Sequence, residues 1–132
     1  MAGKIIVDTL EHSTAGSIAT NYVVNGSAKA WGMFDSEPST AVVNDSLNVS
    51  SILGNGTGDD TISFTNAFSS VNIGIVGTAS ENTSSGQTAG RFFHLDEDNL
   101  SASSPRLFCK NTSNSSLDFC NGSSFVVHGD LA

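Results

Sequence analysis

Small polar residues are the feature that most limits the folds open to this chain. Serine, threonine, asparagine and glycine supply 58 of its 132 residues, as 22 Ser, 11 Thr, 12 Asn and 13 Gly. Ser, Thr and Asn side chains bond nearby backbone groups and glycine has no side chain, so these residues favour turns over long helices. Lys and Arg, which are good helix formers, together number only five. The sequence therefore predicts many short strands joined by polar turns.

Short apolar runs between these turns indicate where the strands lie. We expect strands at residues 29–34, 61–65, 71–75, 91–95, near 107–108, near 117–119 and at 125–127. Residues 61–65 and 71–75 both alternate apolar and polar side chains, and we expect them to be neighbours in one sheet. The run from Leu47 to Ile52 reads as one strand with a bulge at Ser50–Ser51. Turn signals recurring along the chain predict an all-β fold, an antiparallel β-sandwich or a jelly-roll-like domain.

The first 27 residues have a different pattern from the rest. Lys4 to Leu10 predicts a short strand, Glu11 to Ser17 a polar linker, and Asn21 to Gly26 a second strand with an Asn-Gly turn. We therefore divide the chain into an extended N-terminal arm, residues 1–27, for attachment or oligomerisation, and a β-sandwich domain, residues 28–132, with outward loops. The glycine and serine content raises the entropy cost of folding, and oligomerisation would offset that cost.

The charge balance excludes several partners. The formal net charge is −8, and the five Lys and Arg residues are scattered along the chain. Nucleic acid binding needs clustered cations, so we expect no nucleic-acid partner and no anionic membrane surface. No apolar run approaches the ~20 residues of a membrane span, and the N-terminal apolar run is too short for a signal peptide. The sequence predicts a protein made and assembled in a cytoplasm, or released by a route other than the Sec pathway.

The chain has two cysteines, Cys109 and Cys120, and two states are open to them: a disulfide between them, or two reduced thiols. A hairpin turning at Asn114–Ser115 would place them opposite each other at a distance that suits a disulfide. Without a secretory signal, we favour the alternative that both are reduced and pack as small apolar side chains.

Candidate cation ligands are few. Asn55 to Ser63 matches a calcium-binding nonapeptide except at its first residue, with Asp60 as the side-chain ligand, but that motif works in tandem copies and this chain has one. A glycine-rich hairpin loop explains the same residues better. Asp96 and Asp98 belong to the densest carboxylate run, for which a solvated loop is the preferred interpretation. We therefore expect no metal, no cofactor and no catalytic residue.

Four segments carry a resemblance to a known family: Val7 to Ser17, Tyr22 to Trp31, Asp45 to Ser51 and Gly56 to Ala67. Together they resemble small virion proteins of tailed bacteriophages, especially marine ones, of the tail-fibre or fibre-like type. The resemblance covers about residues 3 to 76. It implies a β-rich virion component, trimeric, whose arm attaches to other virion proteins of the capsid or tail and whose variable loops, from Gly77 onward, face outward.

Two functions follow as expectations. The first is a non-enzymatic bacteriophage structural protein, displayed on the virion as a capsid-decorating or fibre component after assembly in the host cytoplasm. The alternative is a receptor-binding tail-fibre module, in which an exposed Tyr22 or Trp31 would stack on host glycans. For Trp31 we favour a place in the core, because large aromatic side chains are mostly buried.

Overall fold

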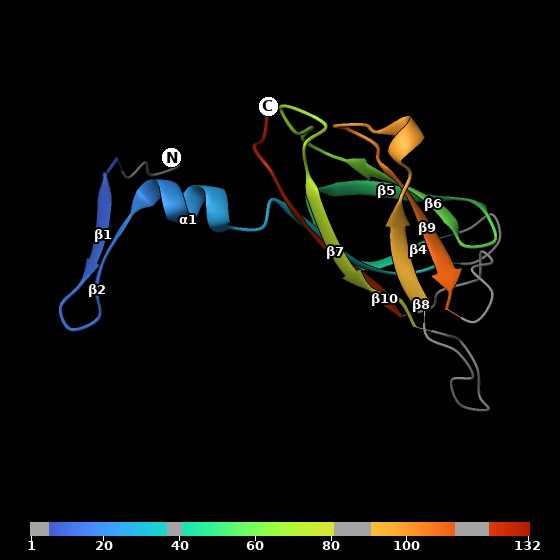
Figure 1. The fold of residues 1–132 in the computed structure, drawn as a ribbon, viewed down its shortest axis with the longest axis horizontal. Coiled ribbons are helices and arrows are strands. Elements are labelled where there is room, and N and C mark those ends of the chain that lie inside the picture. The colour runs from blue at the N-terminus through green and yellow to red at the C-terminus, as the bar shows by residue number, and fades with distance from the viewer. Residues whose placement is uncertain (1–5, 37–40, 81–90, 113–121) are drawn as a thin grey trace.

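The computed structural model describes residues 6–36, 41–80, 91–112 and 122–132 (Figure 1). The strands are β1 (Thr9–His12), β2 (Gly16–Ala19), β3 (Ala30–Asp35), β4 (Val42–Leu47), β5 (Val49–Gly56), β6 (Asp59–Phe64), β7 (Gly74–Thr78), β8 (Arg91–Leu95), β9 (Arg106–Asn111) and β10 (Ser123–His128). The helices are α1 (Thr20–Gly26) and the 3-10 helix η1 (Glu97–Asn99). The expected strand at 117–119 and the expected loop at 81–90 lie outside the described residues.

The strands from β3 onward form two antiparallel sheets of four strands each. Sheet I has the order β4-β3-β10-β7, and sheet II has the order β5-β6-β9-β8. The two sheets face each other in Figure 1 and form a sandwich. The all-β sandwich expected from the sequence is therefore confirmed. The expectation that residues 61–65 and 71–75 are neighbours is wrong, because β6 lies in sheet II and β7 in sheet I.

Aromatic rings join the two sheets at the centre of the sandwich. Phe34 of β3 has no exposed surface, and its ring centroid lies 6.0 Å from that of Phe93 of sheet II in a stacked arrangement. The Phe125 ring, from β10 of sheet I, meets Phe34 edge-on at 6.0 Å. Aliphatic side chains complete the core around these rings: Ala30, Ile52, Ile62, Leu107 and Val127. Strand alternation brings these side chains to the inner faces of both sheets.

The chain passes from sheet I to sheet II at Asn48. This residue separates β4 from β5 and adopts a left-handed backbone conformation (φ 57°), which asparagine tolerates better than most residues. Its side chain makes two hydrogen bonds with the backbone of Asn66. The Oδ1 atom accepts from the Asn66 N–H at 2.8 Å, and the Nδ2 atom donates to the Asn66 carbonyl at 3.1 Å. The single strand expected across Leu47 to Ile52 is therefore wrong. The bulge expected at Ser50–Ser51 is confirmed by a register shift between Val49 and Ser51.

The arm consists of a hairpin and a helix. β1 and β2 pair with Leu10 opposite Ile18, and they include residues 11–12 and 16–17 of the segment that the sequence predicted to be a polar linker. The helix α1 replaces the strand expected at residues 21–26. Lys29 holds the carboxyl end of α1, because its Nζ donates to the carbonyls of Val24 and, at 2.9 Å, Ser27. No residue of α1 is buried. The arm extends away from the sandwich (blue in Figure 1).

The state of Cys109 differs from the reduced thiol expected from the sequence. Its side chain is fully buried and disulfide-bonded, so the reduced state favoured from the sequence is wrong for this residue. Its backbone N–H donates to the Gly58 carbonyl at 2.8 Å, and on its other side it pairs with Phe93. Cys120, the other cysteine of the chain, lies outside the described residues.

No helix among the described residues is long and apolar enough to span a membrane.

The close approach of β7 to β10 generates a test of the packing. A Cβ atom on Gly77 would lie 2.4 Å from the Ser124 carbonyl oxygen and 2.9 Å from the Phe93 ring. We expect Gly77→Ala to lower the free energy of unfolding by about 1–3 kcal/mol, because the backbone of β10 must move. Gly74→Ala on the same strand, where a Cβ meets nothing within 4 Å, should change it by less than about 0.5 kcal/mol. Urea unfolding measures both, and equal losses would contradict the packing described.

Candidate functional site

A charged cluster covers the outer face of sheet II beside the β5–β6 turn. Asp59 accepts a hydrogen bond from Arg106 Nε at 2.6 Å and a second from Nη2 of the same guanidinium, so the pair is bidentate. Asn55 Nδ2 also donates to Asp59, at 3.2 Å. The hydrogen bonds from Arg106 hold the pKa of Asp59 below its usual value. Because the guanidinium also lies over the Phe108 ring, 5.2 Å from its centroid, this cluster binds β6 to β9.

Of the three acidic residues that follow β8, the two candidate cation ligands, Asp96 and Asp98, have different surroundings. Asp96 caps η1, since its Oδ1 accepts from the Asp98 N–H at 3.2 Å and its Oδ2 from Asn99 Nδ2 at 3.0 Å. Arg106 Nη1 lies 3.9 Å from Asp96, so one guanidinium contacts two carboxylates. Asp98 is exposed. Asp96 therefore caps the first turn of η1, whereas the Asp98 side chain is exposed to solvent.

Asp60 points the opposite way from Asp59, into the sandwich. Its side chain is 1% exposed, and its Oδ1 accepts a hydrogen bond from Ser36 Oγ at 3.0 Å. Ser36 follows β3 of sheet I, so this bond crosses between the sheets. Asp60 Oδ2 is buried with no hydrogen-bond partner. Burial raises the pKa of Asp60 to about 6, and the nearby Asp59 charge adds to that effect.

The sequence-derived cation candidates therefore differ in their surroundings. Asp60 faces the core, Asp96 caps a helix and Asp98 faces water. Among the residues that the structure describes, no group of three or more His, Cys, Asp or Glu lies close enough together to hold a metal ion. Sequence reasoning missed the pair of Asp59 and Arg106, because no spacing rule relates residues that far apart in the chain.

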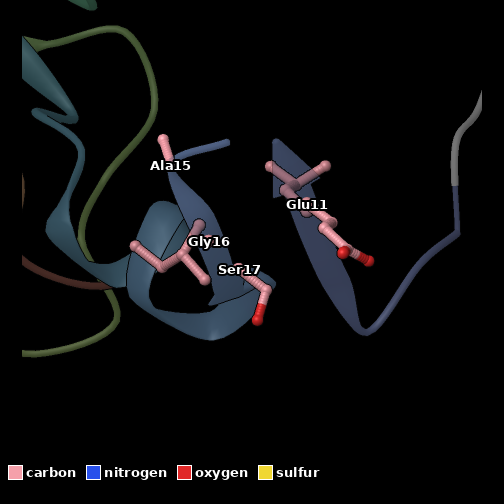
Figure 2. A pocket seen from close by; sticks show the side chains of 6 residues that line it. Glu11, Ala15, Gly16 and Ser17 are labelled. Carbon is pink, nitrogen blue, oxygen red and sulfur yellow. The ribbon is translucent and has the colours of Figure 1, made fainter. Parts of the chain in front are cut away.

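A shallow pocket lies in the arm, away from these carboxylates. It has a volume of about 330 Å³ and is lined by residues of the β1–β2 hairpin: Leu10, Glu11, Ala15, Gly16, Ser17 and Ile18. Figure 2 shows Glu11 on one strand and Ala15, Gly16 and Ser17 on the turn and the other strand. Leu10 and Ile18 are cross-strand partners. Apolar and small side chains dominate this lining, which suits contact with an apolar side chain of another molecule.

The two aromatic residues singled out by the sequence lie in different parts of the molecule. Tyr22 is on α1 and is 68% exposed. Trp31 is half-buried on the outer face of sheet I, because its neighbours Ala30 and Gly32 point inward. The core position favoured for Trp31 is therefore wrong. Both rings are available to a partner.

The chain matches no protein-family model, and comparisons with curated proteins and with solved structures give no match. The resemblance to bacteriophage virion proteins therefore stays a prediction from the sequence.

The raised pKa of Asp60 predicts a specific dependence of stability on pH. Its pKa is near 3.8 in the unfolded chain and about 6 in the folded one, so between these values the folded state binds a proton that the unfolded state does not. Stability should therefore fall as pH rises through this range, by roughly 1–2 kcal/mol between about pH 5 and pH 7.5. In Asp60→Asn, which cannot ionise, this loss should be absent.

Urea unfolding at the two pH values measures the effect. Asp98→Asn is the matched control, because it removes an exposed carboxylate and should keep the pH dependence of the unaltered chain. The same pH dependence in Asp60→Asn would show that Asp60 is not the group responsible.

Proposed function

We propose that the protein is a non-enzymatic structural component of a bacteriophage particle, displayed as a capsid-decorating or fibre protein. The observation that carries the proposal is the arm, in which none of the large apolar side chains that the structure describes is buried. Seven such side chains are exposed: Ile6, Val7, Leu10, Ile18, Tyr22, Val23 and Val24. A concentration of exposed apolar residues in so short a segment marks a contact with another protein.

The size of the arm supports an assembly role. A lone two-stranded hairpin is marginally stable in water, and a helix as short as α1, seven residues, is not stable by itself. The arm therefore gains most of its stability from whatever it contacts. An element of this kind is suited to hold its sandwich on a larger particle.

The sandwich supports a display role. Its core is complete without the arm, since the buried cluster runs from Ala30 to Val127. The surface contributed by serine, threonine and asparagine is polar and the net charge is −8, which disfavours non-specific association with other acidic surfaces. The resemblance noted in the sequence supplies the bacteriophage setting.

A receptor-binding role is the second candidate, and one observation favours it. Trp31 lies on the outer face of sheet I, and the same sheet carries Thr78 and Ser124, whose Oγ1 and Oγ atoms are 2.9 Å apart. A glycan could stack on such an aromatic ring and bond to such hydroxyls. The apolar side chains around Trp31 fit a protein partner better than a sugar.

Quantitative mass spectrometry of purified particles of the phage that encodes the chain tests the proposal. We expect the chain in intact particles in a fixed ratio to the major capsid protein, which serves as the internal standard. A high copy number indicates capsid decoration and a low one a fibre. Absence from the particle would contradict the proposal, and specific binding to a host glycan by the purified chain would favour the receptor-binding alternative.

A further inference from the structure

Exposed apolar side chains gather at two places on this molecule. Of the seventeen large apolar side chains that are exposed among the described residues, seven belong to the arm. Five more point outward from sheet I: Met33, Val42, Leu47, Val76 and Val126. The chain therefore has two separate exposed apolar surfaces, one on the arm and one on the outer face of sheet I.

Strand register turns the second group into a continuous stripe. Trp31 of β3 is opposite Leu47 of β4 and also opposite Val126 of β10, and Val126 is opposite Val76 of β7. Side chains paired in this way lie side by side on the same face of a sheet. The Trp31 stripe, made of Leu47, Trp31, Val126 and Val76, therefore crosses all four strands of sheet I.

The arm of the same chain does not cover this stripe. The arm extends away from the sandwich in Figure 1, and Val76 remains 73% exposed. The hydrogen bonds from Lys29 to the carbonyls of Val24 and Ser27 tie the end of α1 to the residue that precedes β3. With the arm in this direction, contact between the two surfaces requires a second molecule.

The exposed areas agree with what a stable contact between copies needs. Taking roughly 200 Å² for a large side chain in full exposure, the arm residues expose about 750 Å² and the outward residues of sheet I about 500 Å² besides Trp31. Standard interfaces bury about 800 Å² per partner. If two copies exchange arms, burial of half of this area exceeds the ~1,000 Å² expected of a biological interface.

We propose that the exposed apolar side chains of the arm, Leu10 and Ile18 among them, pack on the outer face of sheet I, along the Trp31 stripe, of a second copy of this chain. This contact names the partner of the arm and so rests on the assembly role proposed above. It joins two unlike surfaces, so it forms a reciprocal pair, a closed ring or an open filament.

Two variants of the full chain test the two surfaces one at a time. The arm variant carries Leu10→Lys with Ile18→Glu, and the stripe variant carries Val76→Lys with Val126→Glu. Each exchange replaces a cross-strand apolar pair by an oppositely charged pair, which sheets tolerate and which leaves the net charge unchanged. Leu53→Lys, at a 57% exposed position on the outer face of sheet II, is the matched control.

Sedimentation of each chain across a wide range of concentration gives the oligomeric state. We expect the unaltered chain and Leu53→Lys to self-associate, and each double variant to associate at least about tenfold more weakly. An equal mixture of the two double variants should associate more tightly than either variant alone, because one intact arm then meets one intact stripe. It should associate more weakly than the unaltered chain, because only one of the two contacts forms. Trp31, the one tryptophan of the chain, should shift its fluorescence to shorter wavelength as the stripe is covered.

Three results would overturn the proposal. A monomeric unaltered chain at all concentrations would do so while leaving attachment of the arm to another virion protein intact, so the particle analysis above decides the proposed function separately. Normal association of the stripe variant would show that arms bind arms. A mixture that associates no more tightly than either double variant alone would exclude the arm–stripe contact. If circular dichroism shows that the charged pair unfolds sheet I, Val76→Thr with Val126→Thr makes the same test with β-branched side chains.

Discussion

The packing of Phe34 between the two sheets is the interaction on which the sandwich depends. Its ring stacks on Phe93 of sheet II and meets the edge of Phe125 within sheet I. Two glycines leave the space for this arrangement, since a Cβ on Gly32 would lie 2.9 Å from the Phe125 ring and one on Gly77 would lie 2.9 Å from the Phe93 ring. The abundance of small residues in the chain thus serves the core as well as the turns.

Strand alternation places two neighbouring carboxyl groups of sheet II on opposite faces of the sheet. Asp59 and Asp60 are consecutive on β6, so one faces outward to Arg106 and the other inward to Ser36. The outward carboxylate is stabilised by its guanidinium partner. The inward one has an unpartnered oxygen, and burial therefore favours its protonated form. Below about pH 6 protonation removes the buried charge, whereas at neutral pH the ionised carboxylate lowers the stability of the sandwich.

The pattern of small polar residues and short apolar runs predicted the sandwich, most of its strands and the bulge after Val49. The alternation of apolar and polar residues predicts that one face of a strand is buried, but it does not identify the strands or sheet that pack against that face. For this reason the sheets of β6 and β7 were wrongly joined and Trp31 was wrongly placed in the core. The helix α1 was missed because Val23 and Val24 are β-branched and favour strands, whereas the hydrogen bonds from Lys29 that hold its end involve backbone carbonyls that no motif reveals.

The predicted cation ligands show the same limit. A match to a motif around Asp60 identified residue types, but only the fold decides that this side chain points into the core. The pair of Asp59 and Arg106 joins residues that lie on neighbouring strands and far apart in sequence. The bidentate geometry, and the second carboxylate contributed by Asp96, depend on how β6, β8 and β9 are arranged.

The central claim is that the sandwich is complete in one chain, whereas the arm completes its packing in contact with another copy. Amide hydrogen exchange of the full chain at low and high protein concentration tests this claim most directly. The account predicts slow exchange in β3, β9 and β10 at both concentrations. In β1, β2 and α1 it predicts fast exchange when the protein is dilute and slow exchange when it is concentrated. Equal protection of the arm at both concentrations, at the level of β10, would contradict the account.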